Sequence, residues 1–327
     1  MDFIQDLQNS YPNIFAVVLI VFGFIFLIKG GDCLVDGAKR IAFWLNLSPM
    51  IIGMTILGFG TSMPELLVST QAAIECNSGI AIGNVVGSNI ANIALILGIT
   101  AMINVVPSKS STLRIDVPFS LMATAVFIVA AMSGTIERWH GVLFVLILVA
   151  YMAWIVRYGN KDDADDAESE GDAELRKMPL WKAFVMVVLA FVALVYGAKA
   201  LVFGASSIAR AAGVSDRLIG LTIVAVGTSF PELFSSVSAA RKGETDMAIG
   251  NVIGSLIFNI LSVIGISAAI CPISNSNVGF GSDYLWEFVL SVVLWIFLWT
   301  KRRLSRVEGL LLFFAYLAYL AMTIVKA

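Results

Sequence analysis

Charged side chains are scarce in this 327-residue sequence. Charged residues make up 13% of it and hydrophobic residues 59%, whereas a soluble globular domain has about 25% charged and about 45–50% apolar residues. The mean hydropathy is +0.90. This composition excludes an ordinary soluble domain and predicts an integral membrane protein, with the lipid bilayer as its surroundings.

Histidine and cysteine are also scarce, which narrows the chemistry. His140 is the only histidine, and Cys33, Cys76 and Cys271 are scattered without metal-ligand spacing. The sequence contains no P-loop and no nucleophile and base in register. We therefore expect neither an enzyme nor a bound cofactor. Nothing in the sequence indicates a nucleic acid or an obligatory protein partner.

Ten apolar segments are long enough to cross a bilayer, for which a helix needs about 20 residues. The predicted spans are 13–42, 48–74, 79–106, 116–133, 138–157, 180–211, 215–240, 246–271, 283–300 and 305–325. Lys and Arg concentrate around the loops that follow the odd-numbered spans, so these loops are predicted to be cytoplasmic and both termini to face outward. The N-terminus lacks the basic region of a signal peptide, so the first span is expected to be retained. Short loops favour a prokaryotic inner membrane.

One hydrophilic stretch, 158–180, interrupts the apolar segments. It is rich in Asp and Glu but lacks the register of a calcium-binding loop. Such a composition predicts a solvated linker that stays unfolded. We expect it to be a cytoplasmic linker that joins a first five-helix repeat, 1–157, to a second, 181–327.

The two halves contain the same motif. Residues 48–93 align with residues 215–260 at a constant offset of 167, and 24 of the 46 aligned positions are identical. Five spans per half would insert the second copy upside down, as in the inverted repeats of secondary transporters, although a channel can also contain such repeats. The predicted fold is therefore an all-α membrane protein, with ten helices in two inverted five-helix repeats and broken helices at the midplane.

A proline breaks the helix in each copy, at "GTSMPE" and at "GTSFPE". Pro64 and Pro231 lack the amide N–H that would bind the carbonyl four residues earlier, in Gly60 and Gly227. Unwound backbone at membrane depth occurs where it is buried in protein or lines a cavity. Further backbone carbonyls that could contact a ligand are those of Gly58, Thr61, Ala225 and Thr228.

Two glutamates stand beside these prolines. A carboxylate in the middle of a membrane costs at least a few kcal/mol, so a function is the favoured interpretation of Glu65 and Glu232. Their neighbours are all oxygen donors, which favours a hard cation such as Ca²⁺ or Na⁺ over zinc or copper. The other candidate ligands are Thr61, Ser62, Ser88, Asn92, Thr228, Ser229, Ser255 and Asn259. Glycines 83, 87, 250 and 254 are expected to serve packing.

These paired motifs, "G-T-S-x-P-E" and "G-N-x-x-G-S-x-x-x-N", resemble the alpha-repeats of the cation/calcium antiporter superfamily, particularly its prokaryotic sodium/calcium exchangers. The resemblance implies exchange of Ca²⁺ for Na⁺ by alternating access, with Glu65 and Glu232 as central ligands. The hydroxyl-bearing candidates and Asn92 and Asn259 would complete the site. It also implies that the first and sixth spans slide over the other eight.

Asn259 departs from the family pattern. Many sodium/calcium exchangers have an aspartate at this position, so the local charge here is −2 rather than −3 when both glutamates are ionised. That leaves a Ca²⁺ (or other cation)/H⁺ antiporter of the same fold as the main alternative, and a cation channel as a remote one.

Overall fold

The computed structural model describes residues 12–158, 170–215, 219–274 and 281–326. Almost all of them are helical. The first half contains α2 (Pro12–Leu45), α3 (Pro49–Ile52), η1 (Gly53–Leu57), α4 (Gly58–Thr61), α5 (Met63–Ile74), α6 (Ser78–Ile90), η2 (Ala91–Ile96), α7 (Leu97–Ile103), β1 (Val106–Pro107), η3 (Thr112–Asp116), α8 (Val117–Met132), β2 (Thr135–Ile136) and α9 (Arg138–Tyr158).

The second half repeats this order after a short helix. It contains α10 (Glu170–Lys177), α11 (Leu180–Ala211), η5 (Gly220–Val224), α13 (Ala225–Gly227), α14 (Phe230–Arg241), α15 (Thr245–Phe258), η6 (Asn259–Ile264), α16 (Gly265–Ile270), β3 (Ile273–Ser274), α17 (Gly281–Lys301), β4 (Arg303–Leu304) and α18 (Arg306–Lys326). The elements labelled η are π-helical, with one extra residue in the turn.

Nine of the ten predicted spans can be recognised in the described residues. Eight single helices are long and apolar enough, and the pair Pro49–Thr61 and Met63–Ile74, bent by 44° at its break, passes the same test when its two helices are taken together. The predicted span 215–240 corresponds to η5, α13 and α14, but residues 216–218 lie outside the described residues. The count of ten is therefore not established, whereas the all-helical membrane fold is.

The 167-residue offset reappears in the local structure. The π-helix at Gly53–Leu57 corresponds residue for residue to the one at Gly220–Val224. In the same way β1 corresponds to β3, and the two short ladders pair β1 with β4 and β2 with β3. Each ladder thus joins one strand from each half. Pairing of strands between the two halves is what an inverted repeat predicts.

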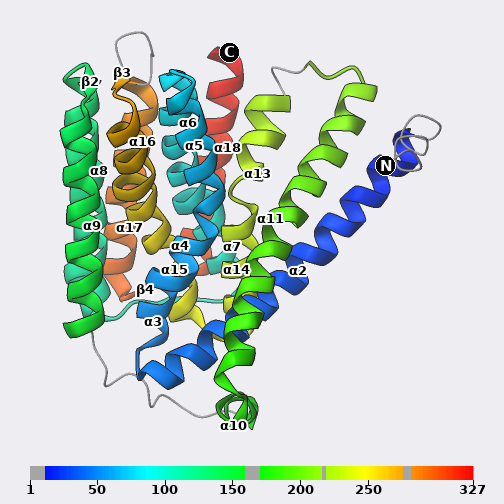
Figure 1. The fold of residues 1–327 in the computed structure, drawn as a ribbon, viewed down its shortest axis with the longest axis vertical. Helices are drawn as coiled ribbons and strands as arrows, with labels where there is room; N and C mark the ends of the chain where they lie inside the picture. The colour runs from blue at the N-terminus through cyan, green and yellow to red at the C-terminus, as the bar shows by residue number, and fades with distance from the viewer. Residues whose placement is uncertain (1–11, 159–169, 216–218, 275–280, 327) are drawn as a thin grey trace.

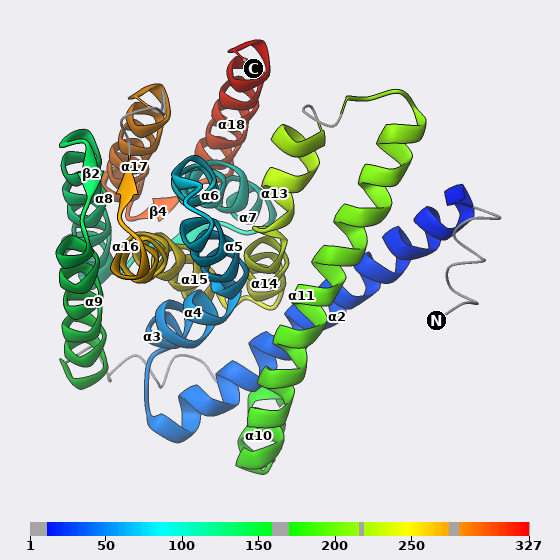
Figure 2. The same cartoon turned by 45° about the horizontal axis from the view of Figure 1, so that its top comes forward.

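Two long helices, α2 and α11, lie side by side and cross over the rest of the bundle (Figures 1 and 2). Glycines allow them to approach closely: a Cβ on Gly23 would lie 2.7 Å from the carbonyl oxygen of Gly197, and one on Gly204 would lie 2.6 Å from that of Ala16. Small residues at such contacts are typical of membrane helix pairs. These helices are the first and sixth predicted spans.

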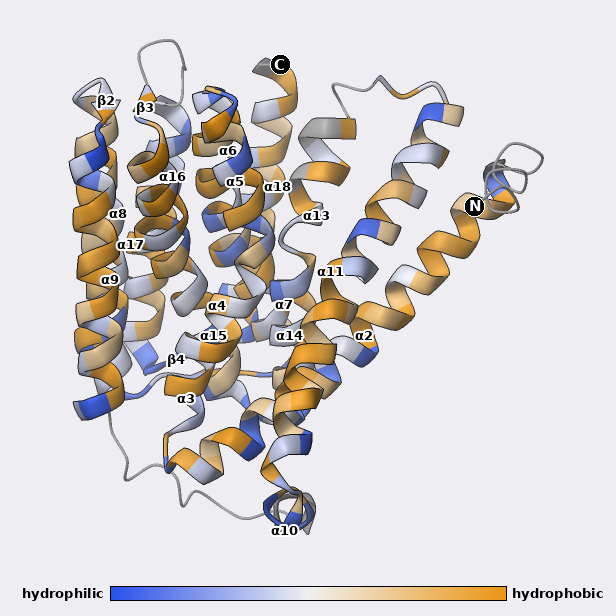
Figure 3. Ribbon diagram, in the orientation of Figure 1, coloured by the Kyte–Doolittle hydropathy of each residue, from blue (hydrophilic) through white to orange (hydrophobic). Residues whose placement is uncertain are grey.

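Hydrophobic residues dominate the long outer helices, and hydrophilic ones gather at α10 and at helix ends (Figure 3). Large apolar side chains on these helices are exposed, for example Val129 at 69% and Val188 at 59%. In water such a surface would be an aggregation hazard. In a bilayer it is the lipid-facing side.

The start of α2 and the end of α18 lie toward one end of the bundle, which we call the terminal end, and α10 and α3 lie toward the other, the α10 end (Figure 1). The linker was predicted to stay unfolded, and this is wrong for its last part, since Glu170–Lys177 is helical. Contacts with α2 stabilise it there: the Arg176 guanidinium lies 4.6 Å from the ring centre of Phe43, and Arg40 Nε donates to the Met178 carbonyl at 2.7 Å. Residues 159–169 lie outside the described residues.

Candidate cation site

The helix break in the first repeat begins at the residue before Met63. Ser62 leaves the helical geometry at φ −79° and ψ 3°, and Pro64 stands in the first turn of the helix that follows. Ser229 does the same in the second repeat, at φ −88° and ψ 6°, ahead of Pro231. In both repeats a π-helix precedes the break. The sequence prediction of a broken helix in each copy is therefore confirmed.

The two breaks differ in their backbone bonds. In the first repeat the Ser62 N–H reaches the Gly58 carbonyl at 3.2 Å, whereas in the second the Ser229 N–H reaches Val226 at 3.1 Å rather than Ala225. The Gly58 carbonyl, one of the further candidate ligands, therefore keeps a helical hydrogen bond. A carbonyl has two lone pairs, so one remains open to a ligand.

Both glutamates are fully buried and stand at equivalent positions of α5 and α14. Ser88 donates to Glu65 Oε1 at 3.2 Å, within the first repeat. Ser62 donates across the repeats to Glu232 Oε1 at 3.5 Å, the outer limit of a hydrogen bond. Oε2 of each carboxylate has no hydrogen-bond partner among the described residues.

The hydroxyl groups join the two repeats around these carboxylates. Ser229 donates to Ser88 Oγ at 3.3 Å, and Thr61 Oγ1 lies 3.5 Å from Ser255 Oγ. The Thr61 hydroxyl also donates to the Leu57 carbonyl at 3.0 Å. Thr228 Oγ1 has no partner in the described part of the chain.

The two predicted asparagines are buried, and most of their polar atoms lack a hydrogen-bond partner among the described residues. Asn92 has no hydrogen-bond partner for either side-chain polar atom within the described residues, and Asn259 has none for its Oδ1. Asn92 lies in η2, and Asn259 is the first residue of η6. Buried polar groups without partners cost about 1–3 kcal/mol each. Because η2 packs against α14 and η6 against α5, the helices of the two glutamates, these unpaired amides point to a ligand.

Two further asparagines, not singled out from the sequence, hold the glutamate backbone. Asn84 Nδ2 donates to the Glu65 carbonyl at 3.2 Å and to Ser69 Oγ at 2.9 Å. Its equivalent, Asn251, donates to the Glu232 carbonyl at 3.4 Å and to Ser236 Oγ at 2.9 Å. Both asparagines belong to the repeated "AIGN" segment, so the repeat itself was the signal that could have found them.

A third buried carboxylate was also missed. Glu287 of α17 is fully buried, and Asn89 donates to its Oε1 at 2.7 Å. Position 120, which corresponds to it in the first repeat, is a serine. Glu287 therefore leaves no trace in the repeat, but an ionisable residue inside an apolar span is itself a signal of function.

Neutral oxygens outnumber carboxylates in this cluster. In the described parts of the chain, no group of three or more His, Cys, Asp or Glu side chains is placed to hold a metal. A cluster of two carboxylates, several hydroxyls and two amides carries little net charge and suits a hard cation. Zinc and copper would prefer nitrogen and sulfur.

A cavity of about 530 Å³ leads toward the cluster from one side. It is lined by residues of α5, α11, η5 and α13, most of them apolar, with Lys199, Arg210 and Thr228 among the polar ones. On the other side, α15 packs directly against α3, η1 and α4. A Cβ on Gly254 would lie 2.5 Å from the Met54 carbonyl oxygen there. The packing role expected of Gly250 and Gly254 is confirmed, since both are in such contacts, whereas a Cβ on Gly87 would meet nothing within 4 Å among the described residues.

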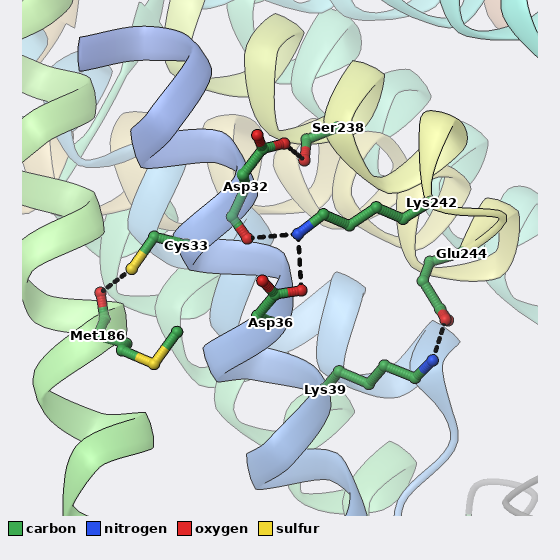
Figure 4. A network of polar contacts seen from close by, with 8 residues as sticks. All are labelled: Asp32, Cys33, Asp36, Lys39, Met186, Ser238, Lys242 and Glu244. Atoms are coloured by element: carbon green, nitrogen blue, oxygen red, sulfur yellow. Dashed lines mark hydrogen bonds and ion pairs between the residues drawn. The ribbon is translucent and has the colours of Figure 1, made fainter. Parts of the chain in front are cut away.

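Charged residues fasten α2 to the turn between α14 and α15 (Figure 4). Lys242 Nζ lies 2.6 Å from Asp36 Oδ1 and 2.8 Å from the Asp32 carbonyl oxygen, and Ser238 donates to Asp32 Oδ1 at 2.5 Å. Lys39 pairs with Glu244 in the same region. These contacts cross from one repeat to the other.

Known proteins share this architecture over almost the whole chain. The profile of the sodium/calcium exchanger protein family matches residues 15–157 and again 182–325. The sodium/calcium exchanger MaX1 of Methanosarcina acetivorans is 34% identical over 93% of this chain and 97% of its own. The inner membrane protein YrbG of Escherichia coli K12 is 31% identical, over 94% and 96%.

A solved structure agrees as closely. The sodium-calcium exchanger NCX_Mj, soaked with 2.5 mM Na⁺ and 0.1 mM Sr²⁺, superposes with a TM-score of 0.82 at 31% identity, covering 94% of this chain and 99% of its own. Family match, relatives and fold thus agree on a multi-pass membrane transporter rather than an enzyme. The chain belongs to the sodium/calcium exchanger family of antiporters.

Proposed function

We propose that this antiporter exchanges Ca²⁺ for Na⁺ at the site between Glu65 and Glu232. One observation carries the proposal: the buried oxygens without partners, Oε2 of both glutamates and Oδ1 of Asn92 and Asn259, come in matched pairs from the two repeats. A buried carboxylate oxygen needs a cation, a proton or a donor. A bound cation satisfies all four oxygens together.

Charge explains why binding would lead to exchange rather than leak. With both glutamates ionised the cluster carries −2, which one Ca²⁺ or two Na⁺ neutralise. An uncompensated charge in a low-dielectric site is costly. The empty site therefore resists the change of access, whereas either loaded form permits it.

The open and closed sides support alternating access. The cavity opens beside α11 and α13, and the opposite side is closed by α15 against η1 and α4. We infer that α2 and α11 form the moving pair, because they pack on each other more extensively than on the remaining helices. With Lys- and Arg-rich loops inside, the cavity faces outward in a prokaryotic inner membrane.

Exchange of Ca²⁺ for protons is the second candidate, and Asn259 is the observation that favours it. An amide in place of an aspartate lowers the charge available for a third Na⁺, and protons on Glu65 and Glu232 could balance the cycle instead. The same cavity and the same ligands would serve both modes.

Flux of ⁴⁵Ca²⁺ into proteoliposomes under a clamped voltage separates the two candidates. We expect uptake with an outward Na⁺ gradient and none with K⁺ in its place. Uptake driven by a pH gradient without Na⁺ would instead establish proton exchange. Saturable flux that needs no counter-ion at all would contradict antiport.

A further inference from the structure

Glu287 is a buried carboxylate that the two repeated motifs do not supply. It lies in the first half of α17, fully buried, and its Oε2 has no partner among the described residues. Such a residue is costly in a membrane interior. Its symmetric position is Ser120, whose hydroxyl donates within its own helix, to the Val117 carbonyl at 2.9 Å.

Hydrogen bonds connect Glu287 to a residue of the candidate site. Asn89 Nδ2 donates to Glu287 Oε1 at 2.7 Å, and Asn259 Nδ2 donates to Asn89 Oδ1 at 3.1 Å. The chain of bonds thus runs from α17 through α6 to the start of η6. It ends on the side-chain oxygen of Asn259, which is buried without a partner in the described part of the protein.

The direction of these bonds is set at the Glu287 end. An ionised carboxylate can only accept hydrogen bonds, whereas an asparagine amide offers a donor on one side and an acceptor on the other. While Glu287 is ionised, Asn89 therefore turns its NH₂ group toward Glu287 and its oxygen toward Asn259. Asn259 must in turn use its NH₂ group on Asn89, which leaves its oxygen free.

We propose that Glu287 is a positioning residue that makes Asn259 present its oxygen, rather than its NH₂ group, to the transported cation. The inference rests on the proposed function, since it assigns a partner to one ligand of that site. It also gives this chain a third carboxylate, connected to Asn259 through Asn89.

Protonation of Glu287 would release this constraint. A carboxylic acid can donate, so both amides could then reverse, and the NH₂ group of Asn259 would face the cation. Helices α6 and α8 and η2, which pack against α17, have no ionisable side chain. The ionisable groups near Glu287 are Asp283 and Tyr284 of its own helix and Tyr319 of α18. Arg114, Asp116 and Arg303, from η3 and β4, pack toward the other end of α17.

Binding of ⁴⁵Ca²⁺ to purified protein tests the inference. Glu287→Gln can bond in either direction, so we expect its Ca²⁺ affinity to fall about tenfold, as for other residues that orient a metal ligand. The difference from wild type should shrink as the pH falls, because protonated Glu287 loses its directing effect. Ser120→Ala, at the symmetric position, should stay within about twofold of wild type.

Variants at Asn259 and Asn89 provide a second test of the inference. Asn259→Asp offers oxygens in either orientation, so Glu287→Gln should cost little when added to it. Asn89→Ser keeps the carboxylate and breaks the chain of bonds, and it should reproduce the loss if Glu287→Gln does not fold.

The same tenfold loss with Asn259 and with Asp at position 259, or a loss independent of pH, would show a structural role for Glu287 and overturn the inference. Loss of binding in Glu65→Gln with unchanged binding in Glu287→Gln would overturn this inference alone, and binding retained in Glu65→Gln would overturn the proposed function.

Discussion

Gly87 and Gly254 occupy the same position of the same motif, 167 residues apart, yet their surroundings are opposite. A Cβ on Gly254 would lie 2.5 Å from the Met54 carbonyl oxygen, and one on Gly87 would meet no atom of the described residues within 4 Å. The α15 side of the site is closed by backbone contact, whereas the α6 side shows no such contact with the described residues. Nearly identical segments are therefore held in two different arrangements.

This difference shows how one sequence repeat can provide two gates. In the other state we expect each repeat to adopt the arrangement that the other repeat has now. The α6 side would then close and the α15 side would open. The other state needs no new type of contact, since each type is already present in one of the two repeats. The shared glutamates stay between the two gates.

The strongest test of the symmetry is the pair of glutamates. Glu65→Gln and Glu232→Gln each remove one charge from a site of −2, and we expect each to abolish Na⁺-driven ⁴⁵Ca²⁺ uptake in proteoliposomes. Equal loss in both variants is expected because the site draws one carboxylate from each repeat. Normal uptake in either variant would refute the site assignment.

The two glycines give the next largest effect. Gly254→Ala forces a methyl group against backbone, and overpacking of this kind costs about 1–3 kcal/mol, so the closed α15 side should open. Single cysteines introduced at the α10 end should then react with a thiol reagent about tenfold faster or more, since a free-energy difference of 1.4 kcal/mol is a tenfold change in an equilibrium.

Gly87→Ala is the matched control. It should leave the present arrangement and its labelling rates unchanged, while it slows transport by disfavouring the arrangement in which the α6 side closes. Equal labelling changes in the two variants would contradict the assignment of one closed and one open side.

A smaller effect is expected where the two supporting asparagines differ. Asn251 also lies near Ser235 Oγ, at 3.0 Å, and near Thr61 Oγ1, at 3.3 Å, whereas Asn84 has just the two equivalent contacts with the described residues. Interhelical hydrogen bonds in membrane proteins contribute about 0.6 kcal/mol on average. Asn251→Ala should therefore lower the thermal midpoint of the purified protein more than Asn84→Ala does. The reverse order would show that the first repeat supports its glutamate more firmly.

The repeated motif explains which parts of this molecule were predictable. Glu65 and Glu232, with Ser88 and Ser255 beside them, could be placed because two copies at one offset define both the helix break and its partner helix. Glu287 could not be found in this way, because the first repeat has a serine at that position. A residue that acts in only one copy leaves no mark in a comparison of copies.

The sequence could not predict which side of the site is closed, for a different reason. The segments around Gly87 and Gly254 read almost alike, "GNVVGS" and "GNVIGS", so local propensity assigns them the same packing. Which of them is in contact depends on how α2 and α11 lie over the bundle. Likewise the end of the linker is helical because Arg40 and Arg176 connect it to α2, a tertiary contact that composition does not reveal.

The smallest expected effect concerns the ion pair between Lys242 and Asp36, which has no counterpart in the other repeat, where Glu75 and Phe203 stand at the equivalent positions. Both side chains are about one-third exposed, and such pairs contribute about 0–1 kcal/mol. Lys242→Gln should therefore raise labelling at the α10 end by no more than about fivefold. Because exposed charges are screened by salt, raising the ionic strength should narrow the gap between variant and wild type. A larger, salt-independent effect would mean that Lys242 holds α2 mainly through the Asp32 carbonyl, and that this single contact biases the two gates.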